Sequence, residues 1–321
     1  MNQYEELKLW RLNNIGSVIN DHKKLNEFHD QLMIKTCQIA LEKIESEWGA
    51  PPTHFAFFVM GSAGRCEQSV WSDQDHGIVY QAETSFQDYF LKLGAEISKG
   101  LAIIGYEECD GNVMAANPLW CKSLLNWEDQ IEAWLEKGDW ESLRFFSTFF
   151  DSRVIVGDKA LLARIKDVAF KKFTKQPYLF RRMYENVGYI EKGIGFFGQL
   201  LPKEKGEDTG TINFKQTILF PYVNALRLLA LVEKIFATST LQRIEELPES
   251  YQVIKRYESD FIKLLDYRLY FQKEAQSYKK VHLLHVNSLS AREKENLKMF
   301  MKNGRELFKK TKQIIEKRCL Q

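Results

Sequence analysis

Asp73 and Asp75 have the residue type and the spacing that suit a metal site. They precede an apolar run at residues 77–80 that is typical of a strand. Residues two apart in an extended chain point to the same face, so both carboxylates are expected to face one point. Two adjacent carboxylates are hard oxygen ligands, which Mg²⁺ accepts together with waters and substrate phosphates. The pair therefore predicts a Mg²⁺ site on an acidic strand.

A glycine–serine turn precedes this acidic pair in the chain. Gly61 and Ser62 follow an apolar run at residues 55–60 that predicts a strand. Gly61 would let the backbone approach a triphosphate closely, and Ser62 with nearby N–H groups could bond its oxygens. A helix over residues 63–70 would point its N-terminus at the anion, and Arg65 would neutralise further phosphate charge. The expected order is strand, phosphate turn, acidic strand.

The elements around this stretch follow from hydrophobic periodicity. Residues 4–48 predict two helices broken near Asn20 and Asp21, either of which could cap the second, and Gly49 ends that helix. Residues 84–101 predict a helix, residues 102–106 a short strand and residues 109–112 a turn. A helix over residues 124–135 places Trp127 and Trp134 on one face, where they are expected to pack.

Residues 143–156 are rich in aromatic and β-branched side chains and predict a strand with Asp151 inside it. Gly157 and Asp158 would close this strand and cap the next helix. An acid within an apolar strand needs a reason, because burying a carboxylate without a partner is costly. Asp151 is therefore a candidate functional carboxylate, and Asp110, in a turn, is its rival.

The remainder of the chain is almost wholly helical in pattern. Helices are expected over residues 161–173, 178–201, 218–236, 240–247, 254–276 and 290–318, with a polar loop at 202–213. The predicted fold class is α+β, with a small mixed sheet and a helical bundle. The predicted domains are N-terminal helices at 1–50, a mixed-sheet domain at 51–173 and a helical domain at 174–321.

Composition excludes several function classes. The formal net charge of +2 arises from 45 basic and 43 acidic side chains, so a protein that coats nucleic acid or an anionic membrane is not expected. No apolar run is long enough to cross a bilayer, and the N-terminus lacks the apolar core of a signal peptide, which favours a cytoplasmic location. The five cysteines are scattered and never spaced as CxxC, so they are read as reduced thiols with mainly packing roles.

The stretch GSAGRCEQSVWSDQDHGIVY at residues 61–80 resembles the signature of the DNA polymerase β nucleotidyltransferase superfamily. More closely, it resembles bacterial nucleotidyltransferases related to the uridylyltransferase of the PII nitrogen-signalling protein. Residues 111–120 (GNVMAANPLW) and 149–158 (FFDSRVIVGD) are similar to two further segments of that family, and residues 195–198 (GFFG), 227–231 (RLLAL), 239–240 (ST) and Arg268 to its substrate-binding domain. The family often carries cyclic-nucleotide-binding and CBS sensor domains ahead of the transferase. The sequence has none of these, so regulation by a fused sensor is not expected.

The resemblance implies roles for the conspicuous residues. Asp73 and Asp75 would bind two Mg²⁺ ions, or Mn²⁺ in their place, and Asp151 would be the third carboxylate that completes the metal site and helps to activate the acceptor hydroxyl. The residues expected to hold the nucleotide are Gly61, Ser62, Arg65, Glu67 and Gln68. For Glu67 and Gln68, ordering of Arg65, a direct nucleotide contact and simple capping or packing remain open. Asn117 and Lys215 are weaker candidates for substrate contact, and His76 is expected to point away from the acidic pair.

The predicted activity is transfer of NMP from ATP or UTP to an acceptor hydroxyl, with release of pyrophosphate. The resemblance allows a protein acceptor, such as a PII-like signalling protein, or a small molecule. The alternative is a non-catalytic nucleotide sensor or interaction module on the same fold. Two adjacent carboxylates that repel each other favour catalysis, because a plain scaffold would not need them.

Overall fold

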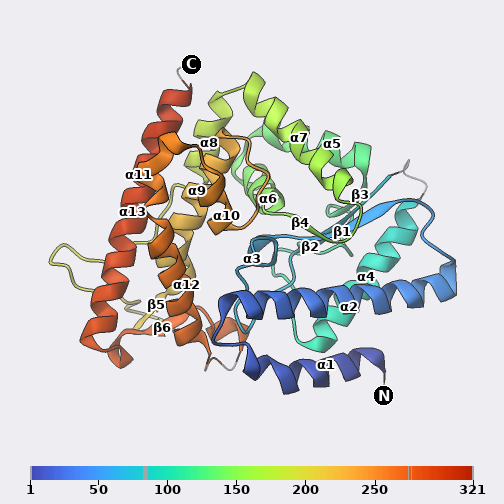
Figure 1. The fold of residues 1–321 in the computed structure, drawn as a ribbon, viewed down its shortest axis with the longest axis horizontal. Helices are drawn as coiled ribbons and strands as arrows, with labels where there is room; N and C mark the ends of the chain where they lie inside the picture. Colours follow the sequence, from blue (N-terminus) through green and yellow to red (C-terminus); the bar gives the residue numbers. More distant parts are fainter. Residues whose placement is uncertain (1, 82–85, 274, 276, 320–321) are drawn as a thin grey trace. The chain divides into compact units, whose positions relative to one another are not determined.

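A computed structural model describes residues 2–81, 86–273, 275 and 277–319 (Figure 1). Its contacts divide the chain into two units, 1–172 and 173–321. The elements of the first unit are α1 (Gln3–Asn14), η1 (Ile15–Ser17), α2 (His22–Trp48), β1 (Phe55–Val59), α3 (Gly61–Gly64), β2 (His76–Tyr80), α4 (Gln87–Ile104), β3 (Cys121–Ser123), α5 (Leu124–Lys137), α6 (Trp140–Phe150), β4 (Arg153–Gly157) and most of α7 (Lys159–Lys175). The start of the helix predicted from residue 84 lies outside the described residues.

In the described part of the first unit, a four-stranded mixed sheet has the order β3-β2-β1-β4. Strand β1 is antiparallel to both β2 and β4, and β2 is parallel to β3. Helices cover both faces of this sheet (Figure 1). The fold class is α+β, as the sequence predicts.

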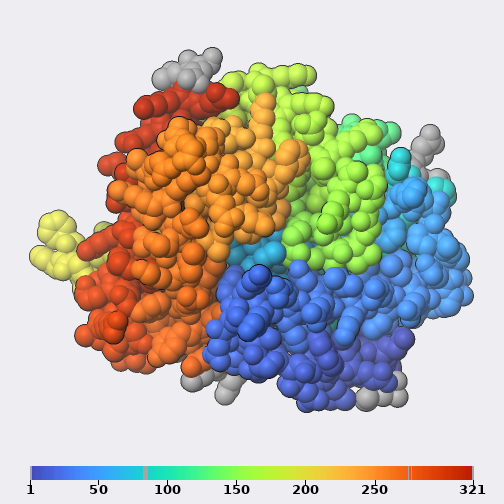
Figure 2. All heavy atoms as spheres, in the orientation of Figure 1, coloured from blue at the N-terminus to red at the C-terminus, as the bar shows by residue number. Residues whose placement is uncertain are grey.

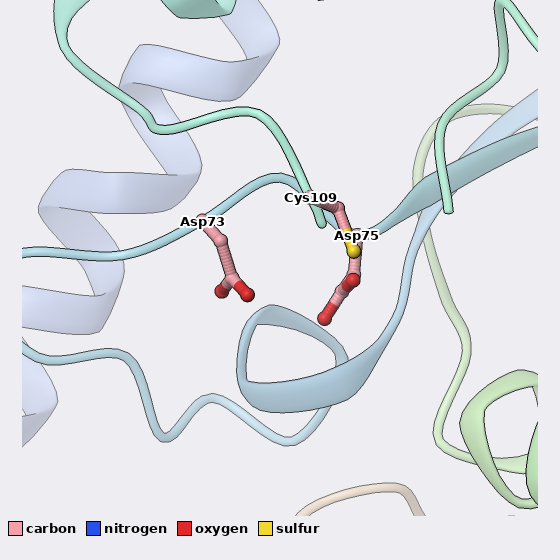
Figure 3. Close-up of side chains that lie close together, drawn as sticks. All are labelled: Asp73, Asp75 and Cys109. Atoms are coloured by element: carbon pink, nitrogen blue, oxygen red, sulfur yellow. The ribbon is translucent and has the colours of Figure 1, made fainter. Parts of the chain in front are cut away.

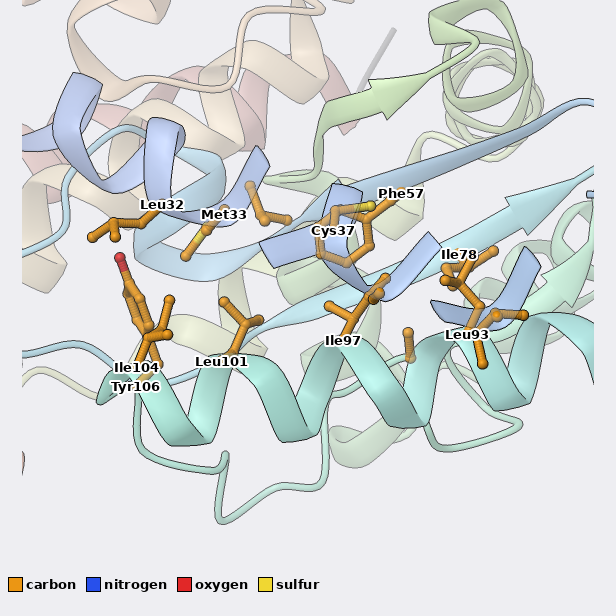
Figure 4. Close-up of a cluster of buried hydrophobic side chains, with 14 of the residues drawn as sticks. Leu32, Met33, Cys37, Phe57, Ile78, Leu93, Ile97, Leu101, Ile104 and Tyr106 are labelled. Atoms are coloured by element: carbon orange, nitrogen blue, oxygen red, sulfur yellow. The ribbon is translucent and has the colours of Figure 1, made fainter. Parts of the chain in front are cut away.

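The core on one face of the sheet lies against α1, α2 and α4. Phe57 of β1 and Ile78 of β2 pack there with Leu93, Ile97 and Leu101 of α4 (Figure 4). On the other face, Phe58 contacts Trp127 of α5 and Phe149 of α6, with ring centroids 5.7 and 6.1 Å apart. Alternate side chains of β1 therefore pack into two separate cores, one on each face of the sheet.

The N-terminal helices belong to the same unit as the sheet. Asp21 caps α2, because its side chain accepts a hydrogen bond from the Lys24 N–H, and Gly49 ends the helix with φ of 82°. Both features agree with the sequence prediction. In the space-filling view the N-terminal residues form a continuous surface on the visible side of this unit (Figure 2).

The strand predicted over residues 143–156 is wrong up to residue 152 and confirmed from Arg153 onward. Residues Trp140–Phe150 form α6, which Asp139 caps by accepting the Ser142 N–H at 2.8 Å, and β4 begins only at Arg153. The buried residues Leu143, Phe146 and Phe150 recur at helical spacing, so their bulk serves a packed helix face. Asp151 lies in the turn between helix and strand.

Three other boundaries differ from the prediction. The helix expected over residues 63–70 is only the single turn α3, and the short strand expected at 102–106 is the end of α4 followed by Gly105 in a left-handed conformation. The helix expected over 178–201 ends at Val187, and its remainder is a loop with a β-bridge between Ile194 and Leu200. Only the third difference follows from a glycine inside a predicted helix, because Gly188 is the C-cap of α8.

The second unit is mainly helical. Its elements are α8 (Tyr178–Val187), β5 (Thr211–Asn213), the π-helix η3 (Lys215–Leu219), α9 (Phe220–Val232), α10 (Thr240–Glu246), η4 (Glu249–Tyr251), α11 (Gln252–Lys255), α12 (Glu258–Gln272), η5 (Tyr278–Lys280), β6 (Leu283–His285), η6 (Val286–Ser288) and α13 (Ala291–Cys319). Helix α9 is buried along almost its whole length and contacts α8, α10 and α13. No helix among the described residues has both the length and the apolar character needed to cross a bilayer.

His29 of α2 is fully buried in the first unit. We therefore expect the stability of the fold to decrease in mild acid. Burial is the main cause that lowers its pKa from 6.5 to about 3. The unfolded chain binds a proton at this residue between these values and the folded chain does not. The contribution of neutral His29 to the free energy of unfolding is therefore complete above about pH 7 and falls by about 1.4 kcal/mol per pH unit as the pH drops below about 6.5.

Urea unfolding at pH 7.5, 6.5 and 5.5, followed by tryptophan fluorescence, measures this pH dependence. His29→Gln should reduce the dependence by about one proton. Equal pH dependence in wild type and His29→Gln would contradict the prediction.

Candidate active site

Asp73, Asp75 and Cys109 form a compact cluster in the first unit (Figure 3). One ligand atom from each, a carboxylate oxygen or the thiol sulfur, lies within 4.8 Å of the others, and all three residues are partly exposed. The two aspartates lie just before β2, and Asp73 forms an isolated β-bridge with Glu107. Asp73 and Asp75 alternate with the buried residues Ser72 and Gln74, so their carboxylates share a face. This common face is what the sequence predicts, although regular strand begins only at His76.

The turn at Gly61 lies directly against Asp75. Gly61 has φ of 54°, and a Cβ added there would stand 2.3 Å from the Oδ2 atom of Asp75. The Met60 N–H also donates to the Asp75 carbonyl at 2.7 Å. Both carboxylates of the acidic pair point toward the α3 turn (Figure 3). The fold thus brings the glycine–serine turn and the acidic pair together at one place.

Cys109 is the member of the cluster that sequence reasoning missed. It belongs to the turn that leads from Cys109 to Asn112, closed by the Asn112 N–H donating to the Cys109 carbonyl at 2.8 Å. Burial and the charge of Asp75 raise the pKa of the thiol to about 12, and the thiol donates a hydrogen bond to the Asp75 carboxylate. Without a bound cation, the thiol is therefore protonated at physiological pH. Its place beside Asp75 arises from tertiary folding and has no signal in local spacing.

We expect the Cys109 thiol to influence metal binding by the acidic pair. Cys109→Val removes the donor at nearly constant volume and is expected to weaken Mn²⁺ binding about tenfold, because Asp75 loses a hydrogen bond that holds its carboxylate. Cys109→Ser keeps a donor and should retain most of the affinity. Isothermal titration with Mn²⁺ makes the comparison. An equal loss in both variants would indicate that the sulfur itself binds the metal.

Arg65 is buried between two carboxylates. Its Nε donates to Glu67 at 2.7 Å and its NH1 to Asp151 at 2.6 Å, and the exposed fractions of these side chains are 4%, 2% and 0%. Burial lowers the pKa of Arg65, but the two carboxylates outweigh this effect and raise it above its ordinary value. With its guanidinium enclosed in this way, Arg65 does not face a solvent-borne triphosphate, contrary to the sequence expectation.

Asp151 and Asp110 both lie outside the acidic cluster within the described residues. Asp151 is fully buried and accepts from Arg65, so the observation that made it a candidate, an acid without an apparent partner, no longer holds. Asp110 is exposed in the turn after Cys109. Neither completes a three-carboxylate site in this structure.

The remaining candidates have defined local partners. Glu67 orders Arg65, one of the roles considered for it. The Nε2 of Gln68 donates to the Ser72 hydroxyl. The side chain of Asn117 bridges the Leu119 N–H and the Asn112 carbonyl within its own turn, and Lys215 belongs to the second unit.

His76 is buried, and its Nδ1 accepts the Ala115 N–H at 3.1 Å. Its Nε2 therefore carries the proton and donates to Gln74. This places the imidazole in the core, away from the acidic pair, as the sequence predicts.

Two family models match the chain. Residues 13–141 match the one described as "Putative nucleotidyltransferase DUF294", and residues 177–315 match the one described as "Putative nucleotidyltransferase substrate binding domain". No curated protein sequence matches the chain. The first match contains the whole acidic cluster and the Gly61 turn, and the two matches together cover most of the sequence. The chain therefore belongs to the family of putative nucleotidyltransferases that carry this substrate-binding domain.

Proposed function

We propose that the protein is a Mg²⁺-dependent nucleotidyltransferase that moves NMP from an NTP to a hydroxyl of a protein or small-molecule acceptor. The observation that carries this proposal is the placement of the Asp73 and Asp75 carboxylates against the left-handed Gly61 turn. A turn without a Cβ allows close approach of a phosphate, and the adjacent carboxylates supply metal ligands at the same place.

The donor set fits a divalent cation of the Mg²⁺ type. The carboxylates of Asp73 and Asp75 are hard oxygen donors on one face, and they outnumber the single sulfur of Cys109 in the cluster. Bound metal would supply neutralisation of the phosphate charge and of the charge that develops on the leaving group. The residues that would hold it are Asp73 and Asp75.

The protein residues contribute binding and orientation. Gly61 and Ser62 would receive the triphosphate at the turn, and the hydrogen bond from the Met60 N–H to the Asp75 carbonyl holds that turn beside the acidic pair. In the reaction, the acceptor oxygen forms a bond to the α-phosphorus, pyrophosphate leaves, and the hydroxyl proton is released. Arg65, which directly follows α3, would stabilise the turn through its buried ion pairs with Glu67 and Asp151.

Transfer of label tests the function. The protein is incubated with Mg²⁺, cell lysate and each α-labelled NTP in turn, and the products are separated into protein and small-molecule fractions. Label on an acceptor together with pyrophosphate release, both absent with Asp73→Asn, is the expected result. Tight NTP binding without pyrophosphate release in any fraction would instead identify a nucleotide sensor.

A further inference from the structure

The segment from Arg65 to Asp75 links the Gly61 turn to the acidic pair, and about half of its residues are buried although it forms no helix or strand. Gln68 and Ser69 are each 1% exposed, and Gln74 is fully buried. Backbone groups buried outside regular structure must find hydrogen-bond partners elsewhere. The geometry of the acidic pair therefore depends on what holds this segment.

The N-terminal helices supply several of those partners. Side chains from α1 and α2 bond to three consecutive residues of the segment: Asn26 to the Gln68 N–H at 2.7 Å, His29 to the Ser69 carbonyl at 2.9 Å and Arg11 to the Val70 carbonyl at 3.2 Å. Helices that precede the sheet in sequence thus fix the loop that leads to the acidic pair.

His29 also forms a second hydrogen bond, to Tyr106, which connects it to Gln74. A carbonyl oxygen only accepts, so the Nε2 of His29 must donate to Ser69, and its Nδ1 then accepts from the Tyr106 hydroxyl at 2.6 Å. The Tyr106 ring lies at the C-terminal end of α4 (Figure 4). The Tyr106 carbonyl in turn accepts from the Nε2 of Gln74 at 3.2 Å. A continuous chain of buried hydrogen bonds therefore connects Ser69 to Gln74.

Gln74 stands between the two aspartates. Its Nε2 also donates to the Ser98 carbonyl at 3.2 Å, and its Oε1 accepts from His76 at 3.1 Å. Alternate residues of an extended segment point to opposite sides, so anchoring Gln74 in the core turns Asp73 and Asp75 outward together.

We propose that His29 and Tyr106 are positioning residues that hold the acidic pair in register with the Gly61 turn. They touch neither carboxylate and act through Ser69 and Gln74. The inference rests on the proposed function where it concerns metal binding, and on the structure alone where it concerns the rigidity of residues 68–75.

Tyr106→Phe removes only the hydroxyl that donates to His29. We expect Mn²⁺ alone, measured by isothermal titration on the full chain, to bind about tenfold more weakly, because a buried acceptor loses its donor and the acidic segment loosens. Amide hydrogen exchange of residues 68–75 is expected to become about tenfold faster in the same variant. His29→Gln provides a second variant on the other side of the same hydrogen bond.

Tyr89→Phe is the matched control. Tyr89 packs in the same core and its hydroxyl also donates to one acceptor, the Gly49 carbonyl at 3.0 Å, away from the acidic segment. The Tyr89→Phe variant should keep the Mn²⁺ affinity and the amide exchange rates of residues 68–75 at wild-type values. Equal effects of Tyr106→Phe and Tyr89→Phe, or wild-type exchange in Tyr106→Phe, would overturn the inference. A wild-type protein that does not bind Mn²⁺ would refute the proposed metal site, and the exchange comparison would still decide the positioning role.

Discussion

Replacing Asp75 by Asn is expected to lower nucleotidyl transfer by about 10³-fold or more. The substitution keeps the shape of the side chain but removes one of the two anionic ligands beside the Gly61 turn. Metal-supplied charge stabilisation is worth several kcal/mol in such reactions, and about 1.4 kcal/mol corresponds to a factor of ten in rate. Pyrophosphate release under saturating NTP, with Mn²⁺ affinity measured in parallel, quantifies the loss.

Asp129→Asn is a suitable control for this change. Asp129 is exposed on α5 and lies outside the acidic cluster, so the same chemical substitution should leave both rate and Mn²⁺ affinity unchanged. Wild-type Mn²⁺ affinity in Asp75→Asn would contradict the assignment of Asp75 as a metal ligand. Lost activity with retained metal affinity would move Asp75 from metal binding to orientation of the nucleotide.

The glycine–serine turn and the acidic pair could be predicted because their residues lie close together in the sequence. Gly61 and Ser62 after one apolar run, and Asp73 and Asp75 before the next, define a turn and a common face through alternation alone. Cys109, His29 and Tyr106 could not be found in this way. His29 lies on α2, and Tyr106 and Cys109 lie in the segment that follows α4. All three reach residues 68–75 through tertiary packing, and their own sequence neighbours do not indicate which groups they will meet.

The misassigned residues 143–152 show a second limit. A run of aromatic side chains suits a strand and a buried helix face equally, and only the Asp139 cap and the helical recurrence of Leu143, Phe146 and Phe150 separate the two. Reading the run as a strand also changed the apparent chemistry of Asp151. Asp151 lies in the turn after α6, where its carboxylate accepts a hydrogen bond from Arg65, a residue distant in sequence.

Arg65 illustrates how an expected phosphate ligand becomes a structural residue. An arginine after a glycine–serine turn has the right chemistry for a triphosphate. The fold instead surrounds it with Glu67, two residues away, and Asp151, 86 residues away. One guanidinium thus pairs with two buried carboxylates one residue after the α3 turn, and its removal is expected to affect the stability of the fold before substrate binding.

Arg65→Met is therefore expected to lower the free energy of unfolding by about 3–5 kcal/mol, the usual consequence of deleting one partner of a buried ion pair. Methionine fills much of the space but leaves Glu67 and Asp151 buried without the guanidinium charge. Urea unfolding followed by tryptophan fluorescence measures the change. The exposed pair of Arg164 with Glu128 provides the control, since Arg164→Met removes the same group from a solvated ion pair and should have a much smaller effect. Similar losses of unfolding free energy in the two variants, or a wild-type urea midpoint in Arg65→Met, would show that the buried ion pairs do not provide the expected stability.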